Sequence, residues 1–256
     1  MRRLVVGTLA FMVFSPVFDA GAADPAVPAY VTAALAAPER QAGAAADYDY
    51  ERHTAAIMTF IGVKPGQKVV ELLPGGGYWT KVFSGIVGPS GHVYTIWADG
   101  YQQYVENSYA RWQKLVATPT YSNVSLLRQA DADFKVPEAV DVVFTNQNYH
   151  DYHDKFMGPV DMGAFDKKVF DALKPGGLFV VIDNVAPAGS GFADTDTIHR
   201  VDPEAVKKEV DSAGFVFDGE SDALKNTADT HLLMSYEPPM AGHNDQFIFR
   251  FKKPMQ

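Results

Sequence analysis

The sequence contains no cysteine, which excludes disulfide bonds, thiolate metal sites and cysteine nucleophiles. It also lacks a long run of basic residues, and its formal net charge is −9. An acidic chain of this kind is not expected to bind nucleic acid or an anionic membrane surface. The phosphate-binding motif G-x-x-x-x-G-K-S/T is missing as well, so a nucleoside triphosphate site of that type is excluded. The partner that we expect is a small molecule.

The first 22 residues have the pattern of a secretory signal peptide. Arg2 and Arg3 precede an apolar run at residues 4–14, and Ala20 and Ala22 occupy the small-residue positions before a cleavage site. The run is shorter than the roughly 20 residues that cross a bilayer, so we expect no stable membrane insertion after cleavage. We therefore predict a periplasmic or secreted protein with a signal peptide at residues 1–22, an N-terminal arm at 23–48 and one domain at 49–256.

Apolar runs alternate with helical patterns along the predicted domain. Strands are predicted at residues 69–73, 93–97, 124–127, 139–146, 178–184, 215–221 and 245–251. Helices are predicted at residues 50–61, 79–87, 103–116, 162–173 and 203–213. This alternation predicts an α/β fold with a mostly parallel sheet that is covered by helices on both faces. The last two strands have no clear helix between them, which predicts an antiparallel pair at one edge.

Three consecutive glycines follow the first predicted strand, in the segment VVELLPGGGYWT at residues 69–80. Glycine permits a tight turn or the close approach of a ligand to the backbone. In an open parallel sheet, ligands bind beyond the carboxyl ends of the strands. Glu71 near the end of this strand is placed to accept a hydrogen bond from a polar ligand group. A glycine-rich turn without a ligand is the alternative.

The glycine segment resembles the first motif of class I S-adenosylmethionine-dependent methyltransferases, an acidic residue followed by alternating glycines. VFDALKPGGLFVVID at residues 169–183 resembles the helix, turn and fifth strand of that family. ADADF at 130–134 resembles its acidic segment after the third strand, and AVDVVFTN at 139–146 resembles its fourth strand. The loop LPGGGY, with NYHD and the signal peptide, also resembles a group of exported, methyltransferase-like bacterial proteins. The resemblance implies a Rossmann-like, seven-stranded methyltransferase fold and S-adenosylmethionine as the cofactor.

The resemblance also implies which residues hold this cofactor. Asp131 is expected to bind the adenine amino group. Stacking of Trp97 on adenine is a separate prediction that the family pattern does not supply. Two positions depart from the family pattern, because Leu73 replaces a usual glycine and Ile96 and Trp97 stand where an acidic residue usually ends the second strand. The full predicted cofactor site is Glu71, Pro74, Gly75, Gly76, Gly77, Tyr78, Trp97, Asp131 and Asn146.

A polar loop, NQNYHDYHD at residues 146–154, follows the predicted fourth strand. In the family this loop faces the methyl-donating sulfonium, and residues 146–149 weakly resemble the N-P-P-Y motif of amino-group methyltransferases without its two prolines. Methyl transfer needs an aligned acceptor and, for an oxygen or nitrogen nucleophile, removal of a proton. We predict His150 as the base, with Asp151 and Tyr149 as the other catalytic residues. A surface or capping role for this histidine is the alternative.

The remaining histidines do not define a metal site in the sequence. Their spacing is irregular and matches no established ligand motif, so no metal ligand is assigned among His150, His153, His199, His231 and His243. The predicted function is an exported S-adenosylmethionine-dependent methyltransferase acting on a small molecule. One alternative is a protein of this fold that no longer uses the cofactor and binds another ligand or a metal through its His- and Asp-rich loops. Another is a scaffold or interaction module.

The export prediction can be tested on the protein isolated from the bacterial envelope. N-terminal sequencing is expected to give a chain that begins at Ala23 or Asp24, because signal peptidase cleaves after small residues. An intact Met1 in the soluble cytoplasmic fraction would contradict the prediction.

Overall fold

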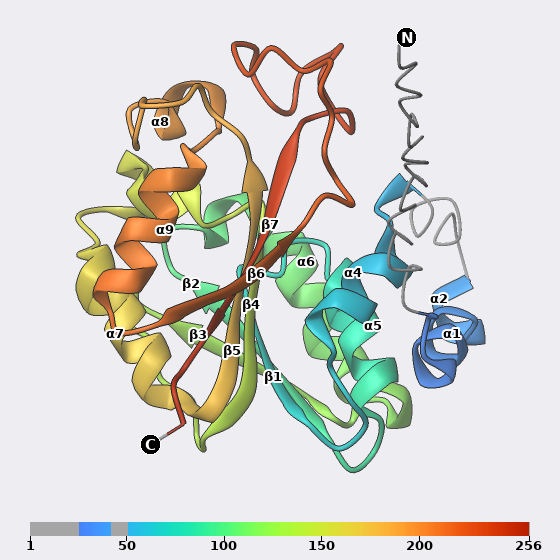
Figure 1. Ribbon diagram of the computed structural model, residues 1–256. Helices are drawn as coiled ribbons and strands as arrows, with labels where there is room; N and C mark the ends of the chain where they lie inside the picture. The colour runs from blue at the N-terminus through green and yellow to red at the C-terminus, as the bar shows by residue number, and fades with distance from the viewer. Residues whose placement is uncertain (1–25, 42–50, 256) are drawn as a thin grey trace, which may run out of the picture.

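A central sheet organises the chain in the computed structural model, which describes residues 26–41 and 51–255 (Figure 1). The predicted signal peptide lies outside the described residues, as do residues 23–25 and 42–48 of the predicted arm. The described part of that arm includes a helix whose Val31 and Ala34 are buried against the domain. Among the described residues, no helix has both the length and the apolar character needed to cross a bilayer.

The sheet has seven strands in the order β3-β2-β1-β4-β5-β7-β6. All neighbouring pairs are parallel except those that β7 makes with β5 and β6. This confirms the predicted mostly parallel sheet with an antiparallel pair at one edge. The strands are β1 (Lys68–Leu72), β2 (His92–Ala98), β3 (Val124–Gln129), β4 (Val140–Asn146), β5 (Leu173–Asn184), β6 (Val216–Ser221) and β7 (Gln246–Lys252).

Helices connect the strands and cover both faces of the sheet, as Figure 1 shows. The α-helices are α1 (Ala29–Leu35), α2 (Pro38–Gln41), α4 (Thr54–Ile61), α5 (Tyr78–Val87), α6 (Gln102–Leu115), α7 (Met162–Ala172), α8 (Thr195–Ile198) and α9 (Pro203–Ser212). Short 3-10 helices are η1 (Pro119–Tyr121), η2 (His150–His153) and η3 (Lys155–Met157). The five helices predicted within the domain are all present, with ends shifted by a few residues.

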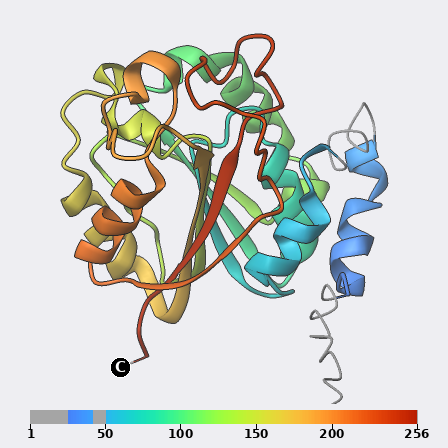
Figure 2. The same cartoon turned by 45° about the horizontal axis from the view of Figure 1, so that its top comes forward.

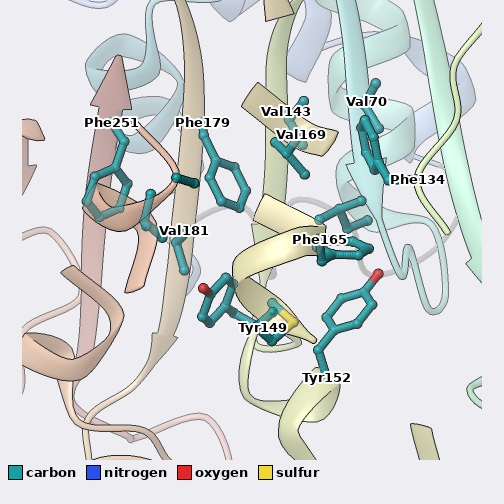
Figure 3. Close-up of a cluster of buried hydrophobic side chains, with 14 of the residues drawn as sticks. Val70, Phe134, Val143, Tyr149, Tyr152, Phe165, Val169, Phe179, Val181 and Phe251 are labelled. Carbon is teal, nitrogen blue, oxygen red and sulfur yellow. The ribbon is translucent and has the colours of Figure 1, made fainter. Parts of the chain in front are cut away.

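Two apolar cores lie on the two faces of the sheet. The first packs α7 and α9 against the sheet and is shown in Figure 3, where Tyr149 and Tyr152 lie in the same cluster as Phe165. The second packs α1, α4, α5 and α6 against the opposite face. β1 is buried along almost its whole length, because it lies in the middle of the sheet with helices on both sides.

Long connections gather at the carboxyl end of the parallel strands. The segment between β6 and β7 lies at the same end as α8 (Figure 2), and the Ser235 amide donates to the Ile198 carbonyl. A buried ion pair fixes this segment, because the guanidinium of Arg200 donates to Asp229 at 2.9 Å and both side chains are fully buried. The same guanidinium donates to Asn244. These contacts hold the long connections over the edge of the sheet where ligands bind in such folds.

The glycines in the turn between β1 and α5 have different structural roles. A Cβ on Gly77 would lie 2.0 Å from the indole nitrogen of Trp112, and the φ of Gly77 is +80°. A Cβ on Gly76 would meet nothing within 4 Å. The Gly76 carbonyl instead accepts hydrogen bonds from Arg111 and Trp112 of α6. Gly77 therefore allows the turn to pack on α6, whereas Gly76 leaves open space beside the backbone.

This difference can be measured with two matched substitutions. Gly77→Ala is expected to lower the free energy of unfolding by roughly 2–5 kcal/mol, because it adds both backbone strain and a collision with Trp112. Gly76→Ala is expected to change it by no more than about 0.5 kcal/mol. Urea denaturation of the two variants measures both effects, and equal losses of stability would contradict the assignment.

Candidate functional site

A cavity of about 860 Å³ lies at the carboxyl ends of β1 and β4. This volume is typical of a small-molecule or cofactor site. One wall is the glycine turn, and another is the polar loop after β4. Ser235 and Tyr236 reach it from the connection between β6 and β7. Of the residues predicted to bind the cofactor, those that line the cavity are Glu71, Pro74, Gly75, Gly76, Tyr78 and Asn146.

Glu71 lies at the inner wall of the cavity and is 2% exposed. The Thr80 hydroxyl donates to its carboxyl oxygen at 2.5 Å. Burial raises the pKa of Glu71 to about 8, and the Thr80 hydrogen bond lowers the pKa only in part. The side chain is therefore largely protonated at neutral pH, when it presents both a hydrogen-bond donor and an acceptor.

Leu73 has a backbone conformation that is usual for glycine. Its φ is +46°, in the left-handed region, and its side chain is buried in the core on the α7 side while it also lines the cavity. The chain thus keeps a glycine-like turn at a position where the related motif has glycine. The apolar contacts of the side chain offset the strain of this conformation.

Three residues of the predicted site lie elsewhere. Trp97 is fully buried, and its indole nitrogen donates to Thr95 at 2.8 Å, so the predicted stacking on adenine is wrong for this structure. Gly77 faces Trp112 rather than the cavity. Asp131 is outside the cavity wall and accepts a hydrogen bond from the Gly100 amide at 2.6 Å. It orders the turn after β2 instead of facing the ligand space.

Tyr101 supplies the aromatic side chain that Trp97 does not. It lies in the turn three residues beyond the end of β2 and lines the cavity, with its hydroxyl 3.4 Å from the amide nitrogen of Asn148. Burial, aided by the negative charge of Asp151, raises the pKa of Tyr101 to about 12. The family pattern gave no signal for this residue, because the pattern expects a side chain at the end of the strand and Tyr101 lies in the turn beyond it.

Tyr149, predicted to be catalytic, is in the core (Figure 3). Its hydroxyl lies 2.8 Å from carboxyl oxygens of both Asp166 and Glu209. Burial raises the pKa of Asp166 well above its usual range, and the hydrogen bond from the Tyr149 hydroxyl lowers the pKa only in part. Tyr149 therefore joins α7 and α9 and does not face the cavity.

His150 lies in the cavity wall but is only 2% exposed. Its Nδ1 is 2.8 Å from Asp183, whose carboxylate also accepts from the His150 amide at 3.0 Å. Burial lowers the pKa of His150, but the charges and hydrogen bonds of Asp183 and Asp151 outweigh it and raise the pKa well above the usual range. An imidazole that holds its proton at neutral pH is poorly suited to the predicted role of base.

Four side chains converge beside His150. They are His150, Asp151, Asp154 and His199, and one ligand atom from each lies within 4.8 Å of the others. All four line the cavity. His199 comes from the residue after α8, far along the chain, where it adopts a left-handed backbone with φ +52°. Sequence spacing gave no signal for this grouping, because the contact depends on how α8 packs against η2.

Comparison of the sequence with known proteins gives a short match to a methyltransferase. No family model matches the chain. A 73-residue segment is 33% identical to protein-L-isoaspartate O-methyltransferase of Methanothermobacter thermautotrophicus, covering 28% of this chain and 31% of that relative. The match therefore spans less than a third of the relative's length.

Solved structures resemble a much larger part of the chain. A SAM-dependent methyltransferase from Aquifex aeolicus has a TM-score of 0.54 with 17% identity, covering 77% of this chain and 87% of its own. The (4+2)-cyclase SpnF has a TM-score of 0.56 with 17% identity, covering 80% and 82%. The chain thus has the Rossmann-like fold of class I methyltransferases, as predicted. A cyclase among the neighbours shows that this fold alone does not define an activity.

The raised pKa of Glu71 predicts how stability depends on pH. A buried acid with a folded pKa near 8 and an unfolded pKa near 4.5 stabilises the fold fully below pH 4.5 and loses that contribution as pH rises through 8. At about 1.4 kcal/mol for each unit, the loss is roughly 3–5 kcal/mol. Gln at this position stays neutral. Glu71→Gln is therefore expected to remove this fall in the free energy of unfolding between pH 5 and 9.

The measurement is urea denaturation across that pH range. Glu237→Gln is the matched control, because Glu237 is exposed and the substitution removes a charge without changing the core. Parallel stability profiles for the wild type and Glu71→Gln would contradict the assignment.

Proposed function

We propose that this protein is an S-adenosylmethionine-dependent methyltransferase acting on a small molecule. The observation that carries the proposal is the cavity at the carboxyl end of the sheet, where Gly76 presents its backbone without a side chain. In this class of fold, glycines in the turn after a strand allow a ligand to approach the backbone closely. The fold and the short match to a methyltransferase support the same conclusion.

The residues in the cavity fit this cofactor at its polar groups. The turn from Pro74 to Gly76 leaves room along its backbone, and Glu71 provides a neutral carboxyl at the inner wall. Asn146 at the end of β4 offers an amide with a donor and an acceptor. When bound, S-adenosylmethionine supplies an electrophilic methyl group on a positively charged sulfur.

The family motif has an acidic residue at the end of the second strand to bind the ribose, and this chain has none there. Asp99, the first acid after β2, is half exposed and forms an ion pair with Arg128. Tyr101 lines the cavity near it and offers an aromatic ring with a protonated hydroxyl. We propose that this tyrosine takes part in holding the nucleoside in place of the missing acid.

The chain's contribution to the reaction is then alignment and exclusion of water. An in-line methyl transfer is accelerated when the acceptor is held in attack geometry. Asp151 and His199 line the cavity and are placed to orient an acceptor that carries a hydroxyl or amino group. The net charge of −9 opposes a nucleic acid substrate and supports a small one.

We also propose that the protein works in the periplasm or is secreted. The support is the sequence of residues 1–22 alone. The sulfur-bearing cofactor would then have to reach the protein outside the cytoplasm.

Cofactor binding is tested by thermal unfolding with S-adenosylmethionine or S-adenosylhomocysteine. A ligand at about 100 times its dissociation constant adds roughly 2.7 kcal/mol of stability. Each kcal/mol raises the melting temperature of a chain of this size by about 2–4 °C, so a shift of roughly 5–10 °C is expected. Gly76→Val is expected to remove the shift while the fold persists, because its side chain would fill ligand space and touch no protein atom near its Cβ.

The matched control is Gly163→Val, at an exposed position in the first turn of α7. It should keep the shift of the wild type. If neither adenosyl ligand shifts the wild-type melting temperature at millimolar concentration, the proposal is wrong and the chain uses this fold for a different ligand.

A further inference from the structure

We propose that His150, Asp151, Asp154 and His199 form a binding site for a divalent transition metal, and that Zn²⁺ is the ion that the site fits best. The four residues come from η2, the turn after it and the residue that follows α8. One nitrogen or oxygen atom from each lies within 4.8 Å of the other three. The proposal stands on this geometry and does not depend on the use of S-adenosylmethionine.

The distances between the ligand atoms suit one small ion. Nε2 of His150 lies 3.2 Å from Nδ1 of His199 and 3.2 Å from Oδ1 of Asp151. Nδ1 of His199 lies 3.8 Å from the same Asp151 oxygen and 3.9 Å from Oδ2 of Asp154. A tetrahedral Zn²⁺ with bonds of about 2.0–2.1 Å places its ligand atoms roughly 3.3–3.4 Å apart. Small side-chain movements are enough to close the site.

The atoms behind the ligands are arranged as in known metal centres. Asp183 is fully buried and binds the far nitrogen of His150, at 2.8 Å. Metal-binding histidines generally donate their second ring N–H to a carboxylate or carbonyl, which fixes the ring and its tautomer. Oδ2 of Asp151 accepts from Asn148 at 2.9 Å, which leaves Oδ1 directed at the two imidazoles. Both ligands are therefore held in place by a second partner.

Asp154 provides an independent observation. Its side chain is 1% exposed, and neither carboxyl oxygen has a hydrogen-bond partner within 3.5 Å among residues 26–41 and 51–255, although the Thr195 hydroxyl lies close enough to lower its pKa. A buried carboxylate without hydrogen bonds is costly, and such groups generally pair with a charge or bind a metal. An ion between Asp154 and His199 would satisfy this carboxylate.

The ligand types select the class of ion. Two imidazoles with two carboxylates suit Zn²⁺ and neighbouring first-row metals, whereas Mg²⁺ prefers oxygen ligands alone. All four residues also line the cavity, and His199 is 26% exposed, so an ion here would face the ligand space. Zn²⁺ binding would displace the Nε2 proton of His150, which would then act as a ligand and not as the base. Asp151 and His199 would likewise bind the ion, so an acceptor would be oriented by the metal rather than by these two side chains directly.

The test is calorimetric titration of the tag-free, chelator-treated protein with Zn²⁺, and with Mg²⁺ for comparison. One Zn²⁺ ion per chain is expected, with much weaker binding of Mg²⁺. His199→Ala and Asp154→Asn are each expected to weaken Zn²⁺ binding by about 100-fold or more, since outer partners alone typically account for 10–100-fold. The second substitution keeps the size of the side chain, so loss of packing does not explain its effect.

His243→Ala is the matched control, because His243 is exposed and lies outside the four-residue cluster. It is expected to bind Zn²⁺ as the wild type does. Circular dichroism of the metal-free variants checks that each one is folded. The absence of Zn²⁺ binding in the wild type, or equal affinity in the wild type and both cluster variants, would overturn the proposal. Adenosyl ligand binding is measured separately, so its failure would not affect this result.

Discussion

A single buried carboxylate at the end of β5 holds the loop after β4, which forms the polar wall of the cavity. Asp183, fully buried at the end of β5, accepts hydrogen bonds from the amide and ring of His150 and from the amide of Asn184. Because a buried charge without such partners is very costly, these three donors fix where the loop after β4 begins. That loop carries Asp151 and Asp154, so the polar wall of the cavity depends on the same contact.

A second buried network, around Arg200, fixes other segments that line the cavity. Arg200 is fully buried and binds Asp229, Asn244 and two main-chain carbonyls, which ties the connection between β6 and β7 to the segment after α8. His199 precedes this arginine directly, so the network that anchors the loop also sets the position of an imidazole in the cavity. Breaking a buried pair of this kind leaves an unbalanced charge in the core. The arrangement is therefore a rigid one.

The sheet was predictable from sequence because the central parallel strands are largely apolar runs and most connections between strands contain a helical pattern. The glycine turn and the polar loop were placed at the correct end of the sheet for the same reason. Four residues failed for a reason that pattern cannot supply, among them Asp131, which accepts a hydrogen bond from the Gly100 amide. The side chains of Trp97 and Tyr149 face into the two apolar cores, and Gly77 packs on α6. The grouping of His199 with His150 depends on tertiary packing, which their separation in sequence does not reveal.

The two walls of the cavity differ in what they specify. On one wall Gly76 leaves space and Glu71 is neutral, so this wall selects a ligand by shape and hydrogen bonding. On the other wall, two imidazoles and two carboxylates meet within 4.8 Å, so that wall selects by charge and coordination. A glycine turn is common to the fold, whose neighbours include a cyclase as well as methyltransferases. The charged wall is consequently where we expect the chemistry particular to this protein to be decided.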